Sequence, residues 1–302
     1  MNMLKGMAVL VVILLVASGV KAAIMLPEVK EGALPALDGK LDDPAWQQAN
    51  ALELAEPAMP LRPAIPGTKT TVRLLVGGGK LYIGAECQVA AGAVLKGEKR
   101  EHDGPVFEDE SLELFIAPDG GANPTSYYHF AVNTQGSTTE RHVLDPAWNA
   151  DWQSAVSAGQ DRWTAEMAIP LGTLAGGEAS GHYWRINICR NMYDAKGSFA
   201  QGLVLARPGY HTPNVLVMTG PVVAAALLAS VNATLGEMEK MKEYLSGPDK
   251  KQFKELEKYR AKLEKAKDAM IPAEEALKML ETAWKNAGDM ENNIILNYMF
   301  EK

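Results

Sequence analysis

Cysteine is scarce in this chain, which has only two in 302 residues, Cys87 and Cys189. A framework of several disulfides, common in small exported domains, is therefore excluded. The two cysteines could still bond to each other in an oxidising compartment. Because sequence does not give the distance between their Cα atoms, the paired and the free state both stay open.

Long apolar runs are also scarce, and the longest covers only residues 7–17. That is short of the roughly 20 residues of a membrane-spanning helix. Lys5 precedes the run, and small residues at positions 20 and 22 precede a cut before Ala23. This pattern predicts a signal peptide over residues 1–22, with an uncleaved anchor as the alternative. We therefore expect a secreted or periplasmic protein that has no membrane attachment after cleavage.

Positive charge is in deficit, with 30 Lys and Arg against 37 Asp and Glu and a net charge of −7. Removal of residues 1–22 would also remove Lys5 and Lys21, which gives −7 − 2 = −9. Nucleic acid repels an acidic protein, so no nucleic-acid partner is expected.

Motifs for catalysis are missing as well. The chain has no G-x-S-x-G, no H-E-x-x-H and no Walker loop, and its five histidines lack helical ligand spacing. Carboxylates do gather at residues 108–110 and at Glu113. A glycoside hydrolase needs two carboxyl groups about 5–10 Å apart across the bond, which neighbours on one strand rarely provide. We predict no catalytic residue and keep a glycoside hydrolase as the less favoured alternative.

What the chain does have is alternation of apolar and polar side chains with period two. It runs over residues 111–116 and again over 127–133, with a loop rich in Gly, Pro and Asn between them. This predicts two antiparallel strands joined by a long hairpin loop. Glu113, His129 and Asn133 then lie opposite the most apolar side chains. If the two faces coincide, these residues form a polar cluster on a rigid sheet.

Further alternating segments cover residues 70–76, 81–87, 162–170 and 183–191. Turn residues separate them, and no helical period is found before about residue 220. Many short strands with turns between them predict a mainly β protein, an antiparallel β-sandwich over residues 24–220.

The period changes to that of a helix from Val222 onward, and Pro248 and Pro272 mark helix starts. We predict a small α-helical bundle or coiled-coil appendix over residues 222–302. Its apolar stripes indicate burial before any other role. Self-association through these helices, as in a structural module of an exported assembly, is a further possibility.

The strand region resembles the carbohydrate-binding module family 9 domains, whose sandwich is also compared with DOMON-type sandwiches. Each matching fragment is weak alone, but their order and spacing are specific. The resemblance implies a non-catalytic sugar-binding sandwich and leaves the helical appendix uncovered. The fragments are LDGKLDDPAW at 37–46, LYI at 81–83, EDESLELFI at 108–116, YYHFAVN at 127–133, WTAEMAIP at 163–170 and RINICR at 185–190.

In sugar-binding members of that family, two aromatic side chains clamp a sugar ring while charged and amide groups bond its hydroxyls. The resemblance implies Phe107 as one clamp, Glu113 as the carboxylate and Asn187 as an amide. Arg190 stands where the second aromatic is expected. Either Trp152 replaces that aromatic, or the glycan pocket of the family is absent here.

Two roles are open for Arg190. It could bond hydroxyls or a sugar carboxylate, which would favour acidic glycans. It could instead form a salt bridge with Glu113 that only orders the sheet. Because Arg190 is in phase with the apolar Ile186 and Ile188, it reaches the face of Asn187 only if the strand bulges or ends near Cys189.

Family members can also carry structural calcium. Hard oxygen ligands for such an ion would come from an acidic segment. A solvated acidic loop without an ion is the alternative, and no other cofactor is expected. The candidate residues are Asp103, Glu108, Asp109 and Glu110.

Overall fold

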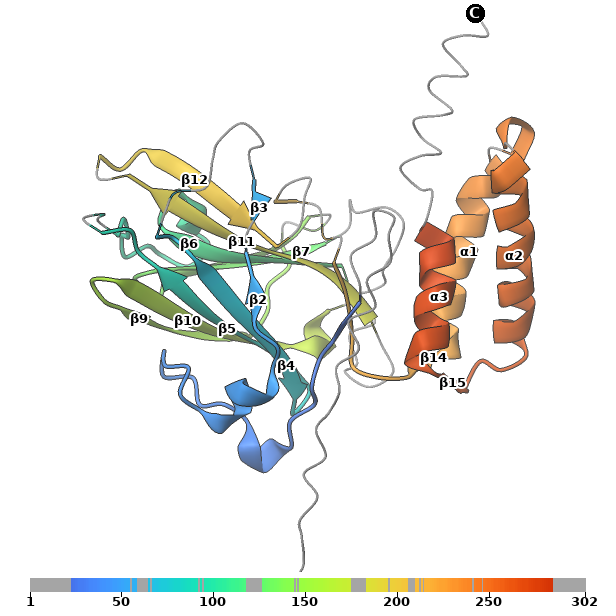
Figure 1. Cartoon of the computed structure of the whole chain (residues 1–302), viewed down its shortest axis with the longest axis horizontal. Coiled ribbons are helices and arrows are strands. Elements are labelled where there is room, and N and C mark those ends of the chain that lie inside the picture. The colour runs from blue at the N-terminus through green and yellow to red at the C-terminus, as the bar shows by residue number, and fades with distance from the viewer. Residues whose placement is uncertain are drawn as a thin grey trace, which may run out of the picture.

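The computed structural model describes residues 23–284, apart from 55, 59–64, 66, 92, 94, 118–126, 144, 146, 175–182, 195, 206–209, 212, 214, 241 and 246. Two β-sheets pack face to face, and three helices lie together at one end of them (Figure 1). This confirms the predicted fold class, a mainly β sandwich followed by a small helical bundle. The predicted signal peptide and the segment after residue 284 lie outside the described residues.

The first sheet has eight strands in the order β1-β13-β11-β6-β7-β8, with β12 beside β11 and β3 beside β12. Neighbouring strands are antiparallel except β1 and β13, which are parallel. Their bounds are β1 (Ile24–Met25), β3 (Glu56–Pro57), β6 (Ser111–Ala117), β7 (Tyr128–Asn133), β8 (Thr138–His142), β11 (Tyr183–Tyr193), β12 (Phe199–Val204) and β13 (Val215–Met218).

The second sheet has five strands in the order β2-β4-β5-β10-β9. The alternating segments 70–76 and 81–87 form a hairpin of β4 and β5, and Gly78 and Gly79 turn it with φ of 54° and 72°. Two residues with positive φ fit the tight turn that follows the twist of a hairpin. The bounds are β2 (Leu52–Glu53), β4 (Thr70–Gly77), β5 (Lys80–Gln88), β9 (Gln153–Ala158) and β10 (Arg162–Pro170).

The main core lies between the two sheets. Alternate residues of β6, Leu112, Leu114 and Ile116, are fully buried there and belong to the same apolar cluster as Ile83 and Met167 of the second sheet. Apolar area removed from water stabilises the fold by roughly 25 cal/mol per Å². The period of two in the sequence therefore identifies the side of each strand that faces this core.

A buried carboxylate ties the start of the sandwich to the second sheet. Glu166 of β10 accepts hydrogen bonds from the backbone N–H of Asp38 and Gly39 at 3.0 and 2.8 Å, and from Nε1 of Trp46 at 3.0 Å. Trp46 is 1% exposed and lies in the short 3₁₀ helix η2 (Pro44–Gln48). Burial raises the pKa of Glu166.

The two cysteines are both free and buried. Cys87 lies in the core between the sheets, whereas Cys189 packs with Phe115 and Val204 in a separate cluster. Because the two thiols belong to different clusters, the alternative in which they form a disulfide is wrong.

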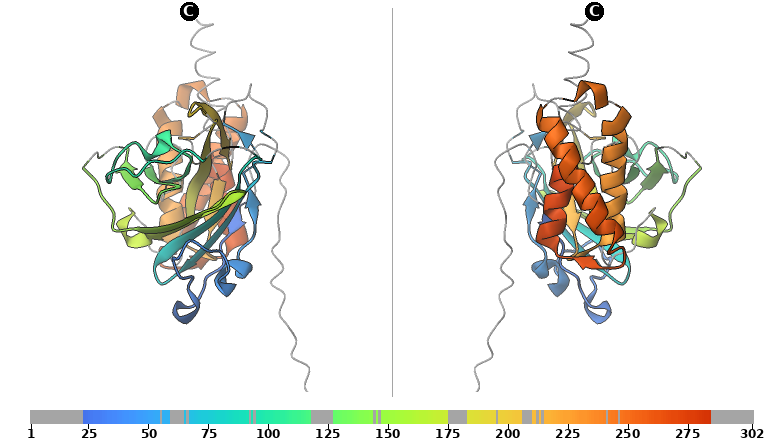
Figure 2. Two further views of the ribbon diagram at one scale, coloured as in Figure 1. Left: turned by 90° about the vertical axis from the view of Figure 1, so that its left-hand side faces the viewer. Right: turned by 90° about the vertical axis from the view of Figure 1, so that its right-hand side faces the viewer.

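Three helices follow the sandwich: α1 (Ala224–Lys240), α2 (Gly247–Glu264) and α3 (Ala273–Trp284). They pack on one another (Figure 2) and share an apolar cluster with Tyr183, Leu216 and Met218 of the first sheet. A small two-stranded sheet pairs β14 (Val222–Val223), which precedes α1, with β15 (Met270–Ile271), which lies between α2 and α3.

Four further 3₁₀ turns complete the described elements. They are η1 (Glu31–Ala33), η3 (Val106–Glu108), η4 (Leu171–Thr173) and η5 (Lys242–Tyr244).

No helix in the described ranges has the length and apolarity needed to cross a membrane.

Candidate functional site

A pocket of about 880 Å³ opens on the side of the first sheet that faces away from the core and extends around its β8 edge, where Glu140 and His142 stand opposite the core-facing Phe130 and Tyr128. Its residues come from β6, β7, β8, β11 and β12 and from the segments that flank them. Aromatic rings and polar groups both contribute, which suits a ligand that has an apolar face and a hydroxylated rim. The lining residues are Asp103, Phe107, Glu113, Tyr127, His129, Glu140, Arg141, His142, Val143, Trp148, Asn191, Phe199, Tyr210 and His211.

Three polar side chains from adjacent strands form what we call the polar floor: Glu113, His129 and Asn191. Oε2 of Glu113 lies 2.6 Å from Nε2 of His129, and Oε1 accepts a hydrogen bond of 2.6 Å from Nδ2 of Asn191. The sheet register explains the meeting, since Glu113 stands opposite Ala131 on β7 and Cys189 on β11. His129 and Asn191 are therefore its diagonal neighbours on the same face.

The floor is rigid because each group has a second contact. The side chain of Glu113 is only 6% exposed. Nδ2 of Asn191 also donates to Oγ of Ser111 at 3.1 Å, and the ring of His129 stacks on Phe115 with centroids 4.4 Å apart. Both carboxylate oxygens of Glu113 are thus held in place before any ligand arrives.

Aromatic side chains form the walls. Phe107 lies on η3, and the guanidinium of Arg141 stands 5.7 Å from the centre of its ring. The carbonyl of Phe107 accepts hydrogen bonds from Tyr193 Oη at 2.9 Å and from Asn191 Nδ2 at 3.4 Å. Burial raises the pKa of Tyr193 to about 12, so this hydroxyl stays a donor at neutral pH. The end of β11 therefore fixes both the floor and one wall.

A second group of rings lies near the other side of the floor. The hydroxyl of Tyr127 is 2.8 Å from Nδ1 of His211, and the ring of His211 meets Phe115 edge-on at 4.9 Å. Desolvation lowers the pKa of His211, and the neighbouring His129 acts in the same direction. The protonated form of His211 is therefore disfavoured.

The structure brings together three of the seven predicted site residues, Phe107, Glu113 and His129, in one pocket. Their faces coincide as the alternation predicts. Their role as sugar contacts stays a prediction.

Asn133 does not line the pocket, and its side chain instead stabilises the turn that follows β7. Its Nδ2 donates to Asp109 and to the carbonyl of Glu98, both at 2.8 Å. Its Oδ1 accepts the backbone N–H of Gln135 and Ser137, both at 3.0 Å. All these contacts are internal, so Asn133 shapes the β7–β8 turn and does not line the pocket.

Trp152 and Asn187 also lie outside the pocket lining. Trp152 donates from Nε1 to Glu140 at 2.8 Å and packs edge-on against Phe130. Trp148, four residues earlier, lines the pocket in its place. Asn187 donates to the carbonyl of Tyr210 at 3.2 Å and so supports the segment that carries this part of the wall.

The placement predicted for Arg190 is wrong. Its side chain is 1% exposed in the core between the sheets, where Nε and Nη2 donate to Oε1 of Glu110 at 2.8 and 2.5 Å. Nη1 donates to Oγ1 of Thr70 at 3.0 Å. The bulge of β11 comes later, between Met192 and Tyr193, so Arg190 keeps the phase of the apolar residues. Its carboxylate partner is Glu110, and the predicted pair with Glu113 does not form.

The acidic segment proposed for calcium is partly neutralised by arginines. Oδ2 and Oδ1 of Asp109 accept from Nε and Nη2 of Arg100 at 2.6 and 2.9 Å. Burial acts to raise the pKa of Asp109, but the hydrogen bonds from Arg100 and Asn133 outweigh it and the pKa is lowered. Glu110 is held by Arg190. Neither carboxylate is free for an ion, and calcium at this segment stays an untested prediction.

Sequence reasoning missed several lining residues. Asn191 could have been found, because it has the same phase on its strand as Asn187. Tyr127 could also have been found, because it has the phase of His129, whereas the others come from segments outside the strongest alternation, where no local pattern identifies them. They are Trp148, Phe199, Tyr210 and His211.

Fold and pocket together define a β-sandwich of the ligand-binding class, with a polar floor between aromatic walls on one sheet. The chain belongs to the family described as carbohydrate family 9 binding domain-like, whose model matches residues 37–206. The match spans the predicted motifs from the Leu37 segment to β12.

Two solved structures are similar to this chain, and the first has the same fold. A carbohydrate binding module family 9 from Caldicellulosiruptor kristjanssonii in complex with glucose is 16% identical, with a TM-score of 0.50 over 65% of this chain and 94% of that chain. A putative carbohydrate-binding protein from Bacteroides uniformis ATCC 8492 is 19% identical over 65% of this chain and 97% of that chain, with a TM-score of 0.48. A search among curated proteins gave no match.

Proposed function

We propose that this chain is an exported, non-catalytic carbohydrate-binding protein that holds a sugar in the pocket of the first sheet. The observation that carries the proposal is the polar floor, in which His129 and Asn191 fix both oxygens of Glu113. A fixed carboxylate accepts hydroxyl donors without first losing conformational entropy. Phe107 and Trp148 supply apolar surface for the C–H face of a sugar ring.

The same contacts support the proposed absence of catalysis. Hydrolysis of a glycoside needs one carboxyl group as acid and a second as base or nucleophile across the bond. The oxygens of Glu113 are already engaged by His129 and Asn191, which leaves the group better suited to binding than to attack. We therefore expect no release of reducing sugar.

The first ligands to test are neutral glucose-type sugars. The structures of family 9 modules from Caldicellulosiruptor kristjanssonii are complexes with glucose and with cellotriose. A preference for acidic glycans no longer has a basis in Arg190, which is buried in the core. Arg141 is the guanidinium that lines the pocket, so a uronic oligosaccharide belongs in the same test.

Glu113→Gln is expected to weaken sugar binding at least tenfold, or about 1.4 kcal/mol, because the charged acceptor is lost. Titration calorimetry with cellotriose and with a uronic oligosaccharide measures this. The melting temperature should change little. Glu86→Gln, an exposed carboxylate on β5 of the other sheet, is the matched control and should bind like wild type.

Equal affinity of wild type and Glu113→Gln would contradict the proposed site. Reducing sugar released by wild type and abolished in the variant would favour a glycoside hydrolase instead. Export is tested separately, by the mass of the protein recovered outside the cytoplasm, which should correspond to a chain that begins at Ala23.

A further inference from the structure

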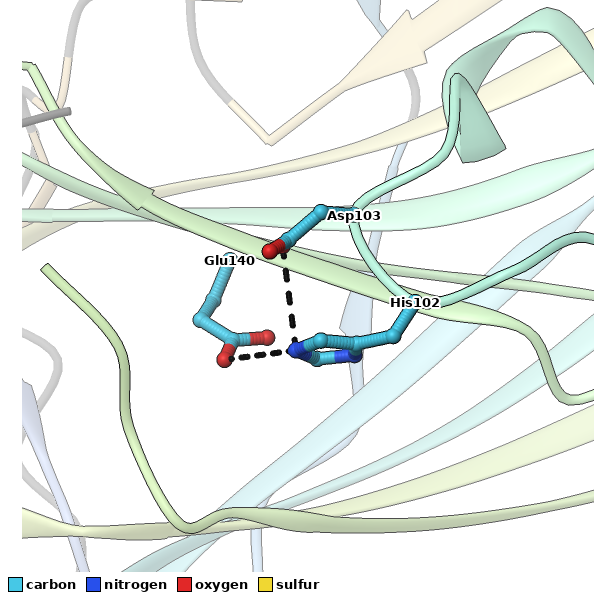
Figure 3. A group of neighbouring side chains, drawn as sticks. All are labelled: His102, Asp103 and Glu140. Carbon is cyan, nitrogen blue, oxygen red and sulfur yellow. Dashed lines mark ion pairs between the residues drawn. The ribbon is translucent and has the colours of Figure 1, made fainter. Parts of the chain in front are cut away.

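We propose that His102, Asp103 and Glu140 form a binding site for a divalent transition-metal ion of the zinc type. The three side chains converge from the loop before η3 and from β8 (Figure 3). Asp103 and Glu140 also line the pocket, so the site lies on its wall at the β8 edge of the sheet.

Distances between the donor atoms suit a small ion. Nε2 of His102 lies 3.2 Å from Oε1 of Glu140 and 3.8 Å from Oδ1 of Asp103, and one donor atom from each residue lies within 4.8 Å of the others. Zinc binds nitrogen and oxygen at about 2.0–2.1 Å in a tetrahedron, which places neighbouring ligand atoms roughly 3.3 Å apart. A modest movement of Asp103, which is half exposed, completes that geometry.

Burial gives an independent reason for a cation here. The side chain of Glu140 is 0% exposed, and among the described residues its only ion-pair partner is His102. A buried carboxylate without a full positive charge beside it is costly. A divalent ion between the three side chains would supply that charge.

Neighbouring groups hold the three ligands in place, as they do around metal sites in general. Nε1 of Trp152 donates to Oε2 of Glu140 at 2.8 Å, while Oε1 accepts the backbone N–H of Ala150 at 3.4 Å and lies 3.2 Å from Nε2 of His102. Nδ1 of His102 is 3.4 Å from Oγ1 of Thr138. The backbone N–H of Asp103 donates to the carbonyl of Thr138 at 3.2 Å, which fixes the loop on β8.

The donor set selects the kind of ion. One imidazole and two carboxylates favour zinc and its neighbours in the first transition row over calcium and magnesium, which prefer oxygen ligands alone. This site therefore differs from the calcium expectation for the acidic segment in both residues and ion. Three protein ligands leave one position open for water or a ligand group.

Calorimetry on the chelator-stripped, tag-free protein tests the proposal. We expect one Zn²⁺ per chain, a rise in melting temperature with the ion, and a Co²⁺ complex whose visible absorption has the intensity of a four-coordinate site. His102→Ala should weaken Zn²⁺ binding at least tenfold. Its side chain is 54% exposed, so the fold should tolerate the change.

Asp103→Asn is a second variant that keeps the backbone, because Asn accepts the φ of 63° at this position. It should also weaken Zn²⁺ binding. Asp161→Asn removes an exposed carboxylate elsewhere and should leave binding unchanged. Failure of Zn²⁺ to bind, or equal binding by wild type and His102→Ala, would overturn the proposal. These readouts need no sugar, so they are independent of the proposed function.

Discussion

Arg190 and Glu110 form an ion pair in the core between the sheets, where an uncompensated charge is most costly. The carboxylate oxygen Oε1 of Glu110 receives donors from Arg190 and from Nε1 of Trp163, the latter at 3.1 Å. Thr70 and the carbonyl of Thr68 accept from Nη1 of Arg190. Arg190 lies on β11 of the first sheet and Glu110 directly precedes β6 of the same sheet, and their hydrogen bonds with Thr70 of β4 and Trp163 of β10 connect it to the second sheet.

Arg190→Ala is therefore expected to lower the free energy of unfolding by about 3–5 kcal/mol, because Glu110 would stay buried without its partner. Urea unfolding of wild type and variant measures the difference. Arg162→Ala, which removes an exposed arginine paired with Glu86, should cost less than about 1 kcal/mol. If Arg190→Ala lost little free energy of unfolding but no longer bound sugar, Arg190 would instead be a residue of the binding site.

The sequence predicts the phase of Arg190 but not its partner. Alternation puts Arg190 on the side of Ile186 and Ile188, which is the core side in the structure. A charged residue at a core position has two explanations, a bulge that moves it out or a buried partner. Glu110 is 80 residues away in the chain, so nothing local decides between them.

At the scale of elements, Glu166 joins β10 to the segment that opens the sandwich. Gly39, with φ of 82°, brings its backbone against Val156, and a Cβ there would lie 2.7 Å from the carbonyl carbon of that residue. Gly39 and Glu166 are therefore both needed here. Gly39 allows the turn, and Glu166 accepts the N–H groups of that turn. The two sequence motifs at 37–46 and 163–170 meet at this contact.

Glu166→Ala should lower the free energy of unfolding by at least about 3 kcal/mol, since each buried donor left without an acceptor costs about 1–3 kcal/mol. Three donors lose their acceptor, those of Asp38, Gly39 and Trp46. Thermal and urea unfolding measure the loss. Glu166→Gln keeps one oxygen and should lose less, whereas Glu86→Ala on the neighbouring strand should change little. Equal stability of Glu166→Ala and wild type would show that this contact is dispensable.

Strand positions follow from the sequence where alternation is strong, as in β5, β6, β10 and β11. The shorter strands β9, β12 and β13 were not predicted. The β13 strand is continuously apolar over Val215–Met218, and β12 contains Gly202, whose missing side chain makes room for the hydroxyl of Tyr210. Such features depend on contacts made after folding, so a window of sequence does not show them.

The candidate site is predictable to a similar degree. Alternation gives the face of Glu113 and of His129, but the register of their strands depends on the loop between them and on pairing with β11. Asn191 enters the floor through that pairing. The aromatic walls come from chain segments that only the completed sandwich brings together.

At the scale of the whole molecule, the helices are continuous with the sandwich through one apolar cluster. Leu227, Val231 and Leu280 are fully buried in the cluster that includes Leu216 of β13. The apolar stripes of the helices are thus covered within one chain. Self-association through the helices stays a prediction, which light scattering on the full chain tests.

Because the cluster is shared, we expect the helices and the sandwich to unfold together. Leu227→Ala should lower the free energy of unfolding by about 2–5 kcal/mol through the cavity it leaves. The helical far-ultraviolet signal and the tryptophan fluorescence should shift to the same lower midpoint. Glu237→Ala, an exposed position on the same helix, is the control. Two separate transitions would instead show that the helical unit folds independently.

The length of β11 separates the helices at one end of the molecule from the pocket near the other. Tyr183, at the start of the strand, belongs to the cluster under the helices, and Asn191 lies in the polar floor. The interval is 191 − 183 = 8 residues, or roughly 26 Å along an extended strand. A protein anchored to a bead or sensor chip through α3 would therefore present its pocket outward and unobstructed, and a ligand in the pocket would not touch whatever the helices contact.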